Sequence, residues 1–171
     1  MKEIEEFSTY SYCTILRRPR GSKKTTMLLM TSAVMDYPII VATHQEAEYI
    51  SQKAKENQMA IPSPLTIGTL LPNTHRRTAT KVLVDNYDQV YTFLLEATLK
   101  DAFDSLGSDW QWQTYIDNMS PLDYLYEHLV SQGYEPVAVT SSYTIEEIKD
   151  QAYKIIQRYK SNLKGGFDRV Y

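Results

Sequence analysis

The chain has 171 residues, of which 43% are hydrophobic and 23% charged, a balance typical of a globular protein. Its formal net charge of -3 excludes a protein that holds nucleic acid through overall charge, so any attraction to phosphates must be local. Cys13 is the only cysteine, which excludes an internal disulfide and a cysteine-rich zinc site, and we expect its thiol in the core. The acidic N-terminus and the short apolar run 27–35 predict a cytoplasmic protein with no membrane contact.

The hydrophobic pattern alternates between strand-like and helix-like segments. In chain order we predict a strand at 10–16, a helix at 25–35, a strand at 38–43, a helix opened at 43–46, strands at 65–71 and 81–85, helices at 87–103 and 120–133, a strand at 135–140 and a helix from 144 to 164. The helix at 25–35 is apolar on nearly all sides and is therefore expected to be buried.

Several helix starts carry capping signals. Thr43 and Glu46 form a capping-box pattern, as do Thr144 and Glu147. Ser120 precedes a proline, which is the preferred order of an N-cap and a first helical residue.

Continuous apolar strands that alternate with helices indicate an α/β protein. We expect a three-layer sandwich with a mostly parallel five-stranded sheet, formed by a single domain over residues 1–171. Its core spans about 10–165, and a short C-terminal tail, 166–171, follows.

Polar side chains gather where the predicted strands end. In an open parallel sheet, ligands bind beyond the carboxyl ends of the strands. The residues at those ends are Arg17, Arg18, Thr43, His44, Asp85, Asn86, Tyr87, Asp88, Thr140, Ser141 and Ser142. Cations, carboxylates and hydroxyls together suit a phosphate group with a metal ion, although His44 alone is better explained as a surface residue of a first helical turn.

Two of these stretches resemble motifs of the P-loop nucleoside triphosphatases, in particular the additional-strand, helicase- and terminase-like ATPases. Arg18-Pro-Arg-Gly-Ser-Lys-Lys-Thr-Thr26 resembles a Walker A loop, and Lys81-Val-Leu-Val-Asp85 resembles a Walker B strand. The resemblance covers roughly residues 10–165. Thr140 and Ser141 are similar in placement to the polar sensor positions of these ATPases.

The resemblance implies ATP and Mg²⁺ as cofactors. Lys24 would contact the β- and γ-phosphates, and Lys24 and Asp85 would be the catalytic residues. Thr25 and Asp85 would hold the metal ion. The nucleotide-binding residues would be Arg20, Gly21, Ser22, Lys23, Lys24, Thr25 and Thr26, through backbone amides at a helix N-terminus.

The chain departs from the family pattern at two positions. Lys23 stands where the loop has a glycine, which matters because that position takes unusual backbone angles. Asn86 stands where a glutamate often polarises the attacking water, so fast hydrolysis is not expected unless Asp88 or another carboxylate substitutes.

These observations leave two main hypotheses open. The first is a nucleotide-binding protein with weak or partner-dependent ATPase activity, of a size that suits a phage or mobile-element accessory protein in DNA transactions; such a site is often completed by a neighbouring subunit or by DNA. The second is a catalytically inactive P-loop-fold module that binds a protein or nucleic acid. A small-molecule kinase ranks third, because no arginine-rich lid segment is evident. The sequences around His75–Arg77 and Trp110–Tyr115 are either ordinary loop and packing residues or contacts to such partners.

Overall fold

The computed structural model describes residues 6–9, 13–21, 23–72, 78–106 and 120–168. Its sheet has the strand order β1-β2-β6-β5-β3-β4. The strands are β1 (Glu6–Thr9), β2 (Thr14–Arg17), β6 (Tyr134–Ser141), β5 (Thr80–Val84), β3 (Ile39–Val41) and β4 (Leu65–Thr66). β1 pairs with β2 antiparallel, and every other pairing is parallel, so the predicted α/β fold with a mostly parallel sheet is confirmed.

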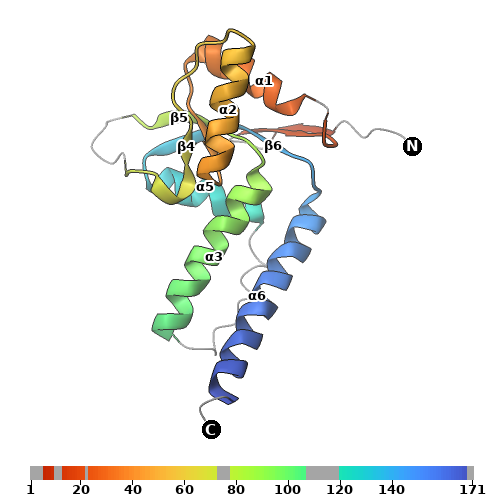
Figure 1. The fold of residues 1–171 in the computed structure, drawn as a ribbon, viewed down its shortest axis with the longest axis vertical. Helices are drawn as coiled ribbons and strands as arrows, with labels where there is room; N and C mark the ends of the chain where they lie inside the picture. Colours follow the sequence, from red (N-terminus) through yellow and green to blue (C-terminus); the bar gives the residue numbers. More distant parts are fainter. Residues whose placement is uncertain (1–5, 10–12, 22, 73–77, 107–119, 169–171) are drawn as a thin grey trace.

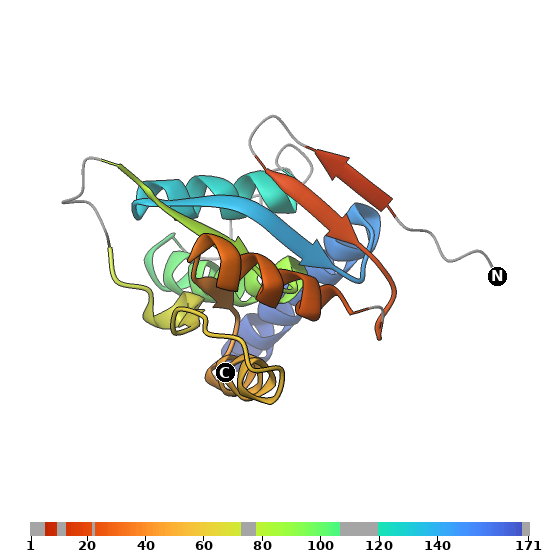
Figure 2. The same ribbon diagram turned by 90° about the horizontal axis from the view of Figure 1, so that it is seen from above.

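Helices cover both faces of this sheet. α1 (Lys24–Met35) and α2 (His44–Glu56) pack on one face, and α3 (Tyr87–Leu106), α5 (Pro121–Ser131) and α6 (Ile145–Asp168) pack on the other. Figure 1 shows α3 and α6 side by side, running away from the sheet, and Figure 2 shows the sheet between α1 and α5. The chain is therefore the three-layer sandwich that the alternating pattern predicts.

The second half of β5, Val82–Val84, is apolar because helices cover it on both faces of the sheet. Val82 and Val84 belong to the cluster under α3, α5 and α6, whereas Leu83 belongs to the cluster under α1 and α2. All three side chains are fully buried. A strand covered on both faces is apolar without alternation between apolar and polar residues. Such a continuous apolar run is the sequence signature of a parallel sheet.

The predicted helix caps are confirmed. The side-chain oxygens of Thr43, Ser120 and Thr144 accept backbone amide hydrogen bonds at 3.2, 3.1 and 3.2 Å. Each cap satisfies one of the amides that a helix leaves without a partner in its first turn.

The structure departs from the prediction at three elements. The strand expected at 65–71 ends as β4 at Thr66 and continues as a 3-10 turn, η1 (Ile67–Thr69), in which the hydroxyls of Thr66 and Thr69 hydrogen-bond and Gly68 lies against the ring of Phe93. α6 does not end at Lys164 but extends to Asp168, through two glycines. β1 was not predicted at all.

The prediction that the helix at 25–35 is buried is wrong for half of its surface. Leu28 and Leu29 of α1 are buried against the sheet. Met30 and Val34 face outward, and Val34 is 81% exposed. Apolar residues on all sides therefore reflect an exposed apolar face here, rather than a helix enclosed by the protein. In the described part of the chain, no helix is both long and apolar enough to cross a membrane.

Candidate phosphate-binding site

The loop between β2 and α1 turns at two residues with left-handed backbone angles. Gly21 has φ 79°, and Lys23, the N-cap of α1, has φ 64° and ψ 27°. The loop is tied to the neighbouring strand by the amide of Arg18, which donates to the carbonyl of Ser141 at 3.1 Å. The left-handed region costs a side-chain-bearing residue about 1–2 kcal/mol. The position that a glycine would suit is thus occupied by a lysine that adopts the required conformation at some cost.

Lys24 is the first residue of α1, and its side chain contacts the loop that precedes the helix. Its side chain is only 7% exposed, and its Nζ donates to the carbonyl oxygens of Arg18 and Pro19, both at 2.9 Å. Burial lowers the pKa of Lys24, while the charges of Asp85 and Asp88 oppose that change. The Lys24 ammonium group therefore holds the backbone of its own loop, and the charges of Asp85 and Asp88 act on it.

Asp85 follows β5 and meets hydroxyls from two other segments. Thr25 Oγ1 donates to its Oδ2 at 3.2 Å, and Thr140 Oγ1 donates to its Oδ1 at 2.7 Å. Burial raises the pKa of Asp85, although the Thr140 and Thr25 hydrogen bonds and the charges of Lys24 and Lys53 lower it. The contact between Thr25 and Asp85 joins the two sequence motifs in space.

A second carboxylate, Asp88, lies one turn further on in α3. It is 2% exposed, and Ser141 Oγ donates to its Oδ1 at 3.0 Å. Burial raises the pKa of Asp88; the hydrogen bond from Ser141 lowers it, and the nearby charge of Asp85 raises it further. The end of β6 therefore holds both carboxylates, through Thr140 and Ser141.

Asn86 has a conformational role between β5 and α3. Its φ is 51°, a left-handed value that asparagine tolerates better than glutamate does. Its backbone amide donates a hydrogen bond to Thr140 Oγ1 at 2.9 Å. Asparagine at this position fits the turn that starts α3.

A polar pocket of about 400 Å³ opens beside these groups. Four segments line it: the loop and start of α1, the middle of α2, the start of α3 and the residues after β6. The lining residues are Arg20, Gly21, Lys23, Lys24, Thr25, Tyr49, Lys53, Asn86, Asp88, Gln89, Ser142 and Tyr143. Its position beyond the carboxyl ends of parallel strands is the one expected for a ligand site.

Most predicted site residues meet at this pocket. Arg20, Gly21, Lys23, Lys24 and Thr25 line it, and Asp85 lies behind Thr25. Thr26 belongs to α1 but does not line the pocket. Ser22 lies outside the described residues, as do the segments 75–77 and 110–115 that were considered as partner contacts.

α2 contributes side chains to the pocket that were not predicted from the sequence. Tyr49 and Lys53 line the pocket, four residues apart on one side of that helix. Residues at this spacing share a helix face, so the pattern Glu46, Tyr49, Lys53 was visible once α2 was placed beside the site. What the sequence lacked was the strand order, which brings α2 next to the loop.

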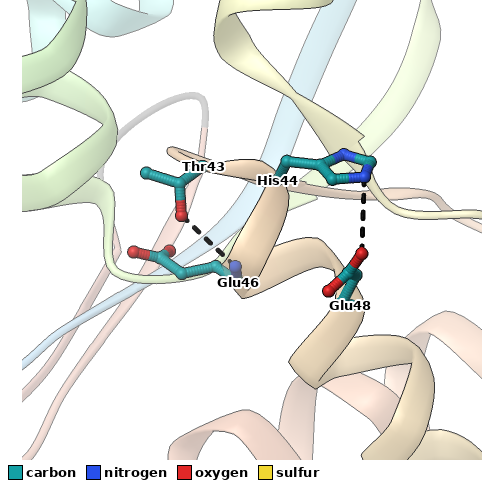
Figure 3. Close-up of polar contacts among 4 residues, drawn as sticks. All are labelled: Thr43, His44, Glu46 and Glu48. Carbon is teal, nitrogen blue, oxygen red and sulfur yellow. Dashed lines mark hydrogen bonds and ion pairs between the residues drawn. The ribbon is translucent and has the colours of Figure 1, made fainter.

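Glu46 takes part in the predicted cap through its backbone amide, and its side chain adds a partly buried carboxylate. Figure 3 shows its carboxylate on the opposite side of the helix start from the exposed ion pair of His44 Nε2 and Glu48 Oε1, which are 3.6 Å apart. Its Oε2 is buried without a hydrogen-bond partner among the described residues. Burial raises the pKa of Glu46, a hydrogen bond with the backbone of Ala42 lowers it, and the charges of Asp85 and Asp88 raise it. His44 is the surface residue that we expected.

The hydroxyl of Thr25 and the carboxylate of Asp85 fit a magnesium ion in chemistry. Both offer oxygen, and they come together at 3.2 Å at the edge of the pocket. Mg²⁺ is commonly bound by one or two carboxylates together with water and substrate phosphates, not by a complete protein cage. The described ranges contain no group of three or more histidine, cysteine, aspartate or glutamate residues that could hold a metal ion.

Taken together, the site combines a buried lysine at a helix start, a hydroxyl beside a buried aspartate, and a cation-rich pocket. Backbone amides at a helix N-terminus and nearby ammonium groups attract anions, and phosphate above all. Comparison with protein-family models, with curated proteins and with solved structures finds no match to this chain.

Proposed function

We propose that the chain is a P-loop-type protein that binds ATP with Mg²⁺ in the pocket at the start of α1. The observation that carries the proposal is the hydrogen bond of 3.2 Å between Thr25 and Asp85, beside the buried Lys24. This contact unites the two motif-like stretches, and no property of either stretch alone requires it. Lys24 would neutralise phosphate charge, and Thr25 and Asp85 would hold the metal ion, which helps to neutralise the phosphates when bound.

The strand order supports the same proposal. β6 lies between β2, which leads into the loop, and β5, which leads into Asp85. This order places the end of β6 next to both motif-like stretches. β6 also supplies Thr140 and Ser141, which hydrogen-bond to Asp85 and Asp88.

Hydrolysis under this proposal is slow or depends on a partner. Asn86 has no carboxylate and is committed to the turn before α3. Asp88 is the carboxylate among the residues that line the pocket, and it is therefore the candidate for accepting a proton from water. The hydrogen bond from Ser141 holds the Asp88 carboxylate in place, so Asp88 is not free to approach an attacking water. A partner such as DNA or a second subunit would then have to complete the site.

Thermal unfolding with magnesium-ATP tests the binding. A ligand at about 100 times its Kd stabilises a folded protein by about 2.7 kcal/mol, which for a chain of this size raises Tm by about 5–10 °C. We expect this shift in the wild type and in the control Lys55→Ala, an exposed lysine of α2. We expect no shift in Lys24→Ala. An unchanged Tm in the wild type at millimolar ATP, or an equal shift in Lys24→Ala, would refute the proposal.

A second candidate function is an interaction module without catalysis. Exposed apolar side chains on the outer side of α1 favour it, namely Met27, Met30, Val34 and Met35. The cost of Lys23 in its left-handed conformation would also be tolerated in a site that no longer needs close phosphate contact. ATPase measurements on the wild type and Asp85→Ala, with and without DNA, separate the two: a rate that depends on Asp85 excludes the inactive module.

A further inference from the structure

The pocket has a cation that neither motif contains. Lys53 comes from α2, on the side of the pocket formed by Tyr49, whereas Arg20, Lys23 and Lys24 come from the loop and α1. The lysine is half-buried, and its Nζ lies 5.7 Å from the centre of the Tyr49 ring and 3.5 Å from the Tyr49 hydroxyl. A cation over an aromatic face is held weakly in that place.

Lys53 has no carboxylate partner within the described ranges. The contacts with Tyr49 leave its donors largely unused, since a contact of 3.5 Å is at the limit of hydrogen bonding. An ammonium group that lines a polar pocket and has no carboxylate within ion-pair distance among the described residues can bind an anionic part of a ligand.

The cations of the pocket divide into two groups by position. The charges of Lys24 and Lys53 both lower the pKa of Asp85, whereas the charge of Arg20 acts on Lys24. Lys53 lies on the α2 side of the pocket, close enough to Asp85 for its charge to act there, whereas Arg20 lies on the loop side. Under the proposed function, Thr25 and Asp85 would hold the metal ion, which would help to neutralise the terminal phosphate, so that phosphate would lie on the side of the pocket nearest Asp85.

We propose that Lys53 binds the terminal phosphate of a nucleoside triphosphate, opposite Lys24, so that the pocket distinguishes triphosphate from diphosphate. The inference rests on the proposed function, because it needs the nucleotide anchored at the Gly21–Lys24 loop. It adds a specificity-determining residue from a helix outside both motifs. Two ammonium groups would then enclose the phosphate that a diphosphate lacks.

Calorimetric titration with magnesium-ATP and magnesium-ADP tests the role of Lys53. In Lys53→Met, which keeps an unbranched side chain of similar length but not its charge, we expect ATP affinity to fall about tenfold and ADP affinity to stay the same. Lys53→Arg should retain most of the preference for ATP. The control is Lys55→Met on the same helix, whose lysine lines a different groove beside β4, and both of its affinities should match the wild type.

The possible outcomes distinguish a failure of the role of Lys53 from a failure of the proposed nucleotide site. If ATP binds and its binding requires Lys24, yet Lys53→Met keeps the wild-type ratio of ADP to ATP affinity, then the role of Lys53 is refuted and the nucleotide site stands. An equal loss of ATP and ADP affinity also refutes it, since Lys53 would then contribute only general positive charge. If the wild type binds neither nucleotide, both proposals fail.

Discussion

Single residues at this site take conformations and environments that their types do not favour. Lys23 has φ 64°, and Lys24, Asp85 and Asp88 are charged groups with little exposure. Buried charges lower stability unless they are paired or bind a ligand, and such residues concentrate where a protein functions. Several residues that are costly to the folded state are thus gathered around one pocket.

The pH dependence of stability should reveal the buried carboxylate of Asp85. Because burial raises its pKa in the folded state, the folded protein binds more protons than the unfolded chain between the ordinary and the raised pKa. The stability that the protonated Asp85 carboxyl group contributes at low pH is therefore lost as the pH rises from about 4 through its raised pKa. In Asp85→Asn this loss should be smaller than in the wild type.

Urea unfolding at pH 4 and at pH 7.5 measures that difference. The lost hydrogen bonds of Asp85→Asn lower stability at both values, so the informative quantity is the change between them. Asp150→Asn, an exposed carboxylate of α6, is the control and should follow the wild type. A fall in stability between the two pH values that is as large in Asp85→Asn as in the wild type would show that Asp85 is not the source.

Whole elements show what periodicity predicts and what it misses. The caps at Thr43, Ser120 and Thr144 were predicted because capping depends on residues within one turn. The strand predicted at 65–71 was too long: β4 ends at Thr66, and Gly68 in the following turn lies against Phe93 of α3, a contact that local sequence does not reveal. α1 was expected to be buried on all sides because apolar composition does not state which face meets the sheet.

Two substitutions in α1 test its sidedness. Leu29 is fully buried under the helix, so Leu29→Ala should cost about 2–5 kcal/mol of unfolding free energy. Val34 is 81% exposed, so Val34→Ala should change it by no more than about 0.5 kcal/mol. Chemical denaturation measures both. Equal losses in the two variants would mean that α1 is enclosed, as its composition alone suggested.

At the scale of the whole molecule, the fold class could be predicted but the neighbours at the site could not. Apolar strands alternating with helices were enough for a mostly parallel sheet, since β3 and β5 are buried on both faces. β1 was missed because its sequence, EFST, is short and largely polar. Lys53 was missed because only the strand order brings α2 beside the loop, and strand order depends on contacts between distant segments.

The arrangement of the sheet is also what gives the site its composition. α1 and α2 leave β2 and β3 toward one face, while α3 and α6 leave β5 and β6 toward the other. Between these diverging connections, one pocket receives cations from α1 and α2 and a carboxylate from α3. The nucleotide proposal therefore depends on the whole sheet as well as on the loop.

Calorimetric titration of the wild-type protein and Lys24→Ala with ATP, each with and without Mg²⁺, tests the central claim most directly. We expect saturable binding of one ATP per chain in the wild type, tighter with Mg²⁺, and no measurable binding in Lys24→Ala. Binding that is absent from the wild type at millimolar ATP, or that is unchanged in Lys24→Ala, would contradict an ATP site at the start of α1.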